Sequence, residues 1–123
     1  MAVGYLTTYG ANSVLSGVAM PTTWHAKGHL GNPGIDALLL PAAETRRVPL
    51  VMDAPAAGAA VNEVGTVASA AATEVFAYLS LWDDSFAGNP WWVVSLLAPV
   101  NIVLGNTIRI PASSLLLSFT LWS

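Results

Sequence analysis

Residues 74–123 read EVFAYLSLWDDSFAGNPWWVVSLLAPVNIVLGNTIRIPASSLLLSFTLWS, and this stretch decides the fold. Glu74–Trp82 and Trp91–Ala98 are rich in aromatic and branched apolar residues, which fit the pleated surface of a half-buried sheet. Between them, Asp83–Pro90 concentrates turn-forming residues, and Pro99 is expected to end the second strand. Further strand-like runs follow at Thr107–Pro111 and Leu115–Trp122. The pattern predicts a meander of antiparallel strands.

The rest of the chain is expected to supply a sheet that packs against this meander. Thr7–Val18 has approximate helical spacing of apolar residues, and Pro21 stops any helix that begins there. Strands are expected at Pro21–Leu30, Glu44–Asp53 and Val61–Ala68. At 123 residues, the chain has the length of one domain. We predict a single all-β domain over residues 1–123, an antiparallel β-sandwich of jelly-roll or immunoglobulin-like type with one short N-terminal helix.

Two of these strands contain residues that predict which face is buried or where in the sheet the strand lies. Pro21–Leu30 alternates between apolar or small residues at even positions and His25, Lys27 and His29 at odd positions. A period of two predicts one buried face, so both histidines are expected to face solvent or a subunit interface. Pro49 in the following strand indicates an edge strand or a bulge, because proline cannot donate to a sheet ladder.

The chain is unusually apolar and poor in charge. Hydrophobic residues make up 54% and charged residues 9%, against about a quarter in typical domains, and the mean hydropathy is +0.61. The best candidate for a membrane span, Trp91–Leu104, is interrupted by Ser95, Pro99 and Asn101 and is shorter than the ~20 residues that a spanning helix needs. We therefore expect no membrane insertion, and a surface largely covered by partner subunits.

Charge and cysteine content narrow the range of partners and sites. The net charge is −3, and of the four basic residues Arg46 and Arg47 are the adjacent pair. A nucleic-acid partner is not expected, because phosphate binding needs a basic surface. The chain has no cysteine, which excludes disulfides and thiolate metal sites.

Candidate metal ligands and catalytic groups form no convincing constellation. His25 and His29 would lie about 13 Å apart on one strand face, too far to share a metal ion directly. Asp83 and Asp84 lack the alternating spacing of a calcium loop and are expected to form a turn. The sequence contains neither a nucleophile elbow nor a phosphate-binding loop, and no pair of acids stands out as a glycosidase pair. We predict no enzyme activity, no metal and no cofactor.

Several short motifs follow one another in an order that resembles a known family. They are Asn12, Leu15 and Gly17 in the helix, then Gly31–Asp36, Arg46 or Arg47, Ala57–Asn62, Leu81–Asp83 and Val103–Ala112. This order resembles small bacteriophage virion proteins labelled tail-fibre or minor tail proteins. Three places depart from the family pattern, which has Gly-Asp at Gly105-Asn106, a Gly-Gly turn at Ser85–Pro90 and smaller residues at Trp91-Trp92. The resemblance implies a compact β-sandwich that assembles in a virion.

Six residues are candidates for a subunit interface: Trp91, Trp92, Trp122, Arg109, Arg46 and Arg47. Trp91 and Trp92 are adjacent, so on a strand one can lie in the core while the other faces a partner subunit. As the family arginine, Arg109 is expected to pair with an acid across strands or subunits. Exposed tryptophans are alternatively suited to stacking on sugar rings.

The expected function is structural. We predict a non-enzymatic bacteriophage protein on the exterior of the virion, a tail-fibre or minor tail protein. It is expected to form a homotrimer and to contact other virion proteins, either of the tail or the major capsid protein. One alternative is a capsid decoration (cement) protein on the head surface. A second is a host-glycan-binding module that uses exposed tryptophans.

Overall fold

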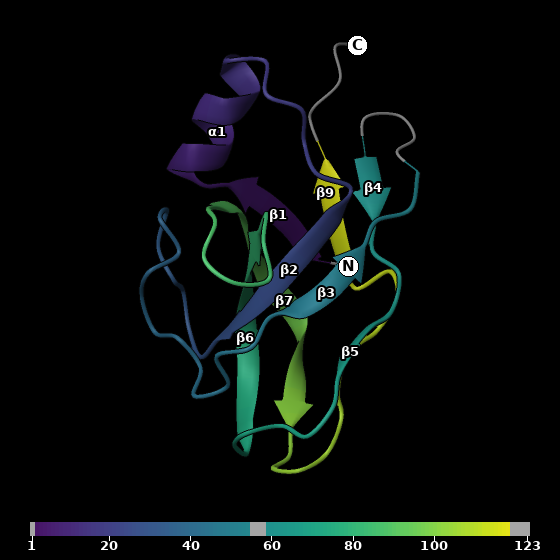
Figure 1. Ribbon diagram of the computed structural model, residues 1–123. Helices are drawn as coiled ribbons and strands as arrows, with labels where there is room; N and C mark the ends of the chain where they lie inside the picture. Colours follow the sequence, from purple (N-terminus) through teal and green to yellow (C-terminus); the bar gives the residue numbers. More distant parts are fainter. Residues whose placement is uncertain (1, 55–58, 119–123) are drawn as a thin grey trace.

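The computed structural model describes residues 2–54 and 59–118 of the chain (Figure 1). Its elements are β1 (Ala2–Leu6), α1 (Thr8–Leu15), β2 (Thr23–His29), β3 (Val48–Val51), β4 (Ala59–Val61), β5 (Gly65–Val67), β6 (Glu74–Trp82), β7 (Pro90–Ile102), β8 (Ile108–Ile110) and β9 (Leu115–Ser118). Among the described residues, no helix is long and apolar enough to cross a membrane.

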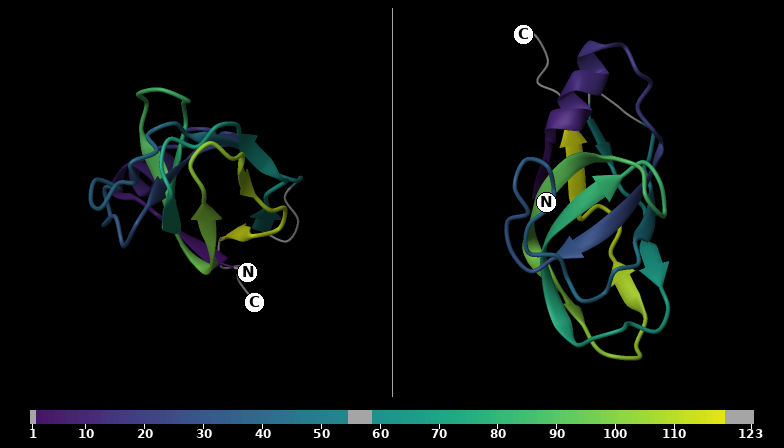
Figure 2. Two further views of the ribbon diagram at one scale, coloured as in Figure 1. Left: turned by 90° about the horizontal axis from the view of Figure 1, so that it is seen from below. Right: turned by 60° about the vertical axis from the view of Figure 1, so that its left-hand side comes forward.

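The strands form a seven-stranded sheet in the order β3-β2-β6-β7-β1-β9-β4 and a two-stranded sheet of β5 and β8. All pairs are antiparallel except β1 with β9. The large sheet curls, because Asp53 N–H donates to Val61 O and Glu63 N–H donates to Val51 O, each at 2.8 Å, and these bonds bring its two edges together. The strands therefore surround one core, as Figure 2 shows. The predicted all-β sandwich with one short helix is confirmed.

The helix α1 lies within the predicted range and covers one end of the sandwich (Figure 1). It begins after Thr7, whose Oγ1 accepts a hydrogen bond from Gly10 N at 3.0 Å, the usual role of an N-cap threonine. Gly10 is buried against β7, and a methyl group there would collide with the carbonyl oxygen of Trp91. The glycine therefore lets the helix approach the strand closely.

The hairpin of β6 and β7 is the predicted one, with its turn at Asp83–Asn89. The expectation that Pro99 ends the second strand is wrong, because β7 continues to Ile102. Phe76 pairs with Val100 but Tyr78 pairs with Ser95, so the residues between Ser95 and Val100 form a bulge. Pro99 lies inside this bulge, where a ladder hydrogen bond is not required of it.

The later strands do not continue the meander, contrary to the prediction. After β7, the strand β8 pairs with β5, and β9 inserts between β1 and β4. The predicted single strand Val61–Ala68 is also wrong, since it divides into β4 and β5 in different sheets. Asn62 lies at the division and is fully buried. Its side chain donates to the carbonyl oxygens of Glu63 and Pro111 and accepts from Leu115 N, each at 2.9 Å, in place of a sheet ladder.

The edge position of β3 confirms the interpretation of Pro49, which lies in the terminal strand of the large sheet. The core between the strands is dominated by aromatic side chains. The largest fully buried ones are Trp24, Trp91, Trp92 and Phe76. The rings of Trp24 and Trp91 have centroids 5.7 Å apart, and Tyr9 of α1 meets Trp91 edge-on at 5.8 Å. Aromatic packing thus joins the helix to the strands.

Candidate interaction surface

The outer face of β2 is covered by the loop that joins β2 to β3, and this decides the environment of His29. Leu30 N–H donates to Leu40 O at 3.0 Å, and Ala42 N–H donates to Gly28 O at 3.1 Å. His29 is fully buried beneath the loop, whereas Leu30 is half exposed. The expectation that His29 faces solvent or a subunit interface is therefore wrong, because a loop of the same chain covers it. A period of two cannot reveal that a loop folds back over the polar face. His25 is partly exposed, as predicted.

His29 belongs to a buried hydrogen-bond network with Ser80 and Trp82 of β6. Its Nδ1 lies 2.9 Å from Leu39 O, and its Nε2 lies 2.7 Å from Ser80 Oγ. Since a carbonyl only accepts, Nδ1 carries the proton, and Nε2 of the neutral ring accepts from the Ser80 hydroxyl. Trp82 Nε1 donates to the same Ser80 Oγ at 2.8 Å. Burial lowers the pKa of His29 below its ordinary 6.5, and the charge of Lys27 lowers it further, against a raising effect of the Leu39 carbonyl.

The contact of Ser80 with His29 has the distance of a serine–histidine catalytic pair, but not its surroundings. Both side chains are fully buried, and Ser80 Oγ already accepts from Trp82. A catalytic hydroxyl must reach a substrate, whereas this one is buried. The hydrogen bonds of the pair instead hold the loop in place. Sequence reasoning missed Ser80 because it lies 51 residues from His29, and only the pairing of β2 with β6 brings them together.

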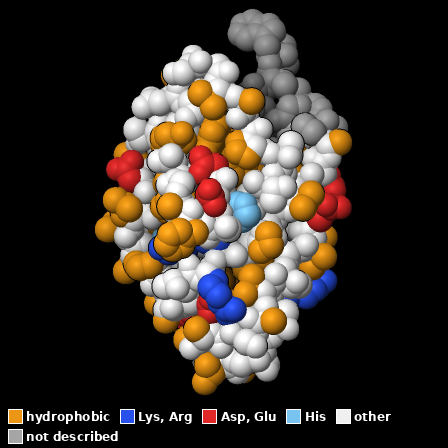
Figure 3. Space-filling view, viewed as in Figure 1, with side chains coloured by type: hydrophobic (Ala, Val, Ile, Leu, Met, Phe, Trp, Pro, Cys, Tyr) orange, Lys and Arg blue, Asp and Glu red, His pale blue; other side chains and the backbone are white. Residues whose placement is uncertain are grey.

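The same loop carries a concentration of exposed aliphatic side chains. Leu38, Leu39 and Leu40 are exposed by 71%, 60% and 57%, and Leu30 by 50%. We call these four residues the leucine patch. In Figure 3, apolar side chains are spread over the face in view, including its left part, where this loop lies in Figure 1. Leu40 has a positive φ of 46°, an uncommon conformation for a non-glycine residue.

A groove of about 310 Å³ runs beside the loop over the outer face of β1, β6 and β7. Its lining comprises Tyr5, Leu6, Asn32, Gly34, Ile35, Tyr78, Val93 and Ser95. None of these side chains is cationic or carboxylic. The sequence had no local signal for this groove, because its walls come from three strands and a loop.

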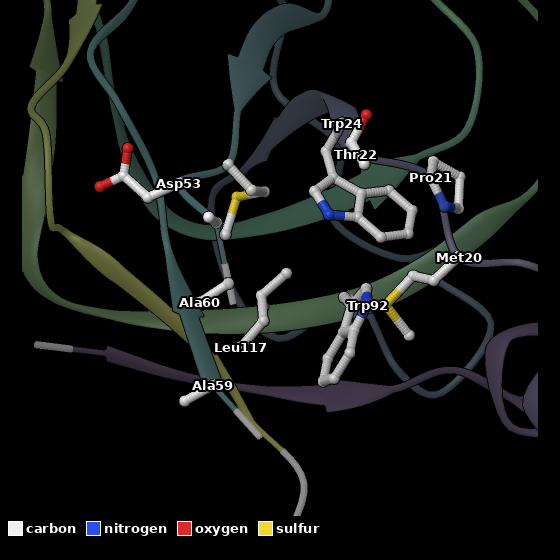
Figure 4. Close-up of a pocket in the computed structure, with 11 residues that line it drawn as sticks. Met20, Pro21, Thr22, Trp24, Asp53, Ala59, Ala60, Trp92 and Leu117 are labelled. Carbon is white, nitrogen blue, oxygen red and sulfur yellow. The ribbon is translucent and has the colours of Figure 1, made fainter. Parts of the chain in front are cut away.

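A second cavity, of about 300 Å³, opens between the two edges of the curled sheet. Met20, Trp24, Met52, Trp92 and Leu117 are among its apolar lining residues. Figure 4 shows the indole rings of Trp24 and Trp92 on one side, with the carboxylate of Asp53 pointing away from them. The cavity is therefore apolar where the tryptophans meet it.

The predicted division of Trp91 and Trp92 between core and partner is wrong. Both side chains are 2% exposed, because the curled sheet places one beneath α1 and the other beside the cavity between the sheet edges. Trp91 Nε1 also donates to Asp83 Oδ2 at 3.1 Å. Trp24 is equally buried, so none of these three rings offers a face to a sugar. Trp122 lies outside the described residues.

The arginines of the predicted interface have different environments. Arg46 Nε lies 2.6 Å from the buried carboxylate of Glu44, and its NH2 group donates to Ser69 O at 2.7 Å. The hydrogen bond from Arg46 lowers the pKa of Glu44, against the effect of burial. Glu44 Oε2 in turn accepts from Ala71 N at 2.7 Å. This pair therefore ties two loops of one chain together, and a role at an interface stays a prediction.

Arg47 and Arg109 lie elsewhere on the surface. Arg47 is 4.1 Å above the Trp82 ring, a cation–π contact, and its NH1 donates to the carbonyl oxygens of Asp84 and Ala87 in the β6–β7 turn. Burial lowers the pKa of Arg47, against the opposing charges of Asp84 and Asp83. Arg109 is exposed on β8, and among residues 2–54 and 59–118 it forms no ion pair. Its predicted acidic partner within the chain is not found in that part.

The acidic turn forms as expected. Asp83 Oδ1 accepts from Asn89 N at 2.9 Å, and Asp84 Oδ1 accepts from Phe86 N at 3.2 Å, which are local turn contacts. In the described part of the chain, no three His, Asp or Glu side chains come together as a metal site.

The fold and its surface define a class of protein. It is a small all-β module with a histidine buried under a loop, an exposed leucine patch and an uncharged groove. The chain belongs to the phage fibre-protein family described as Podophage GP4 fiber I protein gp80, whose model matches residues 3–118. Among curated proteins, none matches the chain. The family resemblance found in the sequence is thus confirmed, and the chain is a fibre-family component of a phage virion.

Proposed function

We propose that this protein is a non-enzymatic fibre component on the exterior of the virion, and that it assembles as a homotrimer through the leucine patch. The family match supports the fibre role over capsid decoration. The observation that carries the assembly role is the exposure of Leu38, Leu39 and Leu40 side by side. Its other partners are neighbouring virion proteins of the tail.

Burying the leucine patch in a subunit contact is more favourable than leaving it exposed to solvent. Exposed apolar clusters of this kind mark interaction sites in soluble proteins, whereas single exposed leucines need no explanation. The loop is also held in a defined shape by His29 and by two hydrogen bonds from Leu38 N and Leu39 N to Pro33 O. A preformed loop loses little conformational freedom when a second copy packs on it.

The test is the oligomeric state of purified protein at micromolar concentration. The wild type is expected to be a trimer by light scattering coupled to size exclusion, and the double variant Leu38→Ser/Leu39→Ser a monomer. Leu15→Ser is the matched control, since Leu15 is 86% exposed at the end of α1 and away from the loop. A monomeric wild type, or a double variant with unchanged mass, would contradict the proposal.

A further inference from the structure

We propose that the uncharged groove beside β1, β6 and β7 is a binding site for a neutral saccharide. This role is additional to assembly and uses different side chains from the leucine patch. It also differs from the site expected of the tryptophans, which are buried.

Strand register places the floor of the groove on the outer face of the sheet. Tyr5 pairs with Val93, and Tyr78 pairs with Ser95, so the four side chains point to the same face. The opposite face holds the fully buried Val94. The two tyrosines lie on the strands that flank β7, opposite Val93 and Ser95, so two strand spacings and a two-residue offset put their Cα atoms roughly 12 Å apart. That separation leaves room for a sugar ring between or across them.

The loop supplies the facing wall and fixes its shape. Asn32 Oδ1 accepts from Gly34 N at 2.9 Å, which orients the amide and leaves Nδ2 as a donor. Ile35 O accepts from Thr8 N at 3.3 Å, so the start of α1 holds the wall at one end. Gly34 has a φ of 79°, a conformation that glycine adopts without strain. The wall is thus preformed.

The polar atoms in the groove are available to a ligand. The hydroxyls of Tyr5, Tyr78 and Ser95, and Asn32 Nδ2, form no hydrogen bond with any residue in the ranges 2–54 and 59–118. Together they provide both donors and acceptors around two apolar side chains, Val93 on the floor and Ile35 on the wall. Tyr5 is 72% exposed, so its ring is open to contact.

This combination favours a neutral sugar over other small ligands. A pyranose has apolar C–H faces that pack on aromatic rings, and hydroxyl groups that need both donors and acceptors. A sulfated or sialylated ligand would find no cation among the lining residues to balance its charge. A purely apolar ligand would leave the groove's polar groups without partners.

The test uses a printed array of neutral oligosaccharides, built from glucose, galactose, rhamnose and N-acetylglucosamine, beside sialylated and sulfated glycans. We expect binding to neutral glycans, with affinity measured by calorimetry for the strongest. Tyr5→Ala and Tyr78→Ala are each expected to weaken it tenfold or more. Ser95→Trp should abolish it, because the indole ring fills the groove and the Ser95 hydroxyl is lost. Phe86→Ala is the matched control, because Phe86 is an aromatic side chain 86% exposed on the β6–β7 turn.

Three results would overturn the proposal: no binding to any neutral glycan, a preference for the anionic glycans, or binding unchanged in both tyrosine variants. Circular dichroism of each variant verifies that the fold is intact. If Tyr5→Ala and Ser95→Trp dissociate the oligomer while no glycan binds, the groove is a subunit contact and the proposal is wrong. Loss of trimers in the leucine-patch variant with glycan binding retained would separate the two roles.

Discussion

At the scale of single residues, buried polar side chains hold the irregular segments against the sheet. His29 holds the loop after β2, Glu44 joins Arg46 to the segment before β6, and Asn62 holds the turn before β9. Each is 0% or 1% exposed. A buried polar group that loses its partners costs more than the hydrogen bond contributed, so these positions are sensitive to substitution and to pH.

His29 should make stability depend on pH below its ordinary pKa of 6.5. Because its pKa in the folded chain is lowered, the unfolded chain binds the proton first as the pH falls. The free energy of unfolding should therefore be highest above about 6.5, the ordinary histidine value, and decline below it. Thermal melts at pH 7.5, 6.5, 5.5 and 5.0 would show a falling midpoint.

The control separates His29 from the other histidine. His29→Gln should melt lower at pH 7.5 but lose most of the slope between pH 7.5 and 5.0, since no proton is taken up at that position. His25→Gln should keep the wild-type slope, because His25 lies outside the buried network. A slope that survives in His29→Gln would show that another group governs the pH dependence.

Asn62 should be among the most sensitive polar positions. Asn62→Ala removes its three side-chain hydrogen bonds and leaves the partners at Glu63, Pro111 and Leu115 short of theirs. We expect a loss of roughly 2–4 kcal/mol in the free energy of unfolding. Urea denaturation would measure it, with the exposed Asn101→Ala as control. A loss below about 0.5 kcal/mol, the range of ordinary surface substitutions, would refute the structural role.

At the scale of elements, close contacts and irregularities set where helix and strands lie. Thr7 donates to Pro90 O and its N–H donates to Trp91 O, which joins the start of α1 to the start of β7. The bulge around Pro99 interrupts the regular hydrogen-bond pairing of β7 with β6 near the C-terminal end of β7. Leu97 is 74% exposed at this bulge, so the distorted end of the strand presents apolar surface.

Gly10→Ala should displace α1 from the sheet. The added methyl group meets the backbone of Trp91, which cannot move aside as a flexible side chain could. The higher helix propensity of alanine, about 1 kcal/mol, works in the opposite direction. We expect the steric effect to dominate, with a net loss of about 1–3 kcal/mol in a urea melt.

The control for this substitution is Asn12→Ala, on the exposed face of the same helix, which should be neutral or slightly stabilising. Near-ultraviolet circular dichroism of Gly10→Ala should also change, because Tyr9 packs against Trp91. A variant as stable as the wild type would mean that the helix can shift without cost.

At the scale of the whole molecule, a charge-poor chain folds into a sandwich that leaves apolar side chains exposed. Low charge alone does not name a partner, but the four exposed leucines of the leucine patch belong to the loop after β2 and the strand end beside it. The family match identifies the chain as a phage fibre protein. The proposed assembly would account for a composition that is unusual in an isolated monomer.

The position of the protein in the particle can be measured by copy number. Quantitative mass spectrometry of purified virions should find this chain at a level close to that of tail components, in small numbers per particle. A level of hundreds of copies, near that of the major capsid protein, would instead identify a decoration protein. Peptides from the major capsid protein and from a tail protein provide the two internal standards.

Much of the secondary structure was predictable because it depends on local signals. The strands Glu74–Trp82 and Thr23–His29, the helix after Thr7 and the edge strand with Pro49 follow from periodicity, capping and proline chemistry. The strand β1 was not predicted, since five residues at the start of the chain carry too little pattern. Its pairing with both β7 and β9 is a long-range event.

By itself, the sequence determined the class of fold, the central hairpin, the family and the low content of charged residues. Alternation and turn residues depend on neighbours in the chain, and composition depends on the sequence alone. Only the tertiary structure decided which side chains face water. It buried His29 under a loop and both Trp91 and Trp92 in the core, and it left Leu38–Leu40 outside. It also assembled the groove from Tyr5, Tyr78 and Asn32. The reason is physical: a curled sheet and a folded-back loop bring distant segments together, and burial depends on those contacts rather than on local pattern.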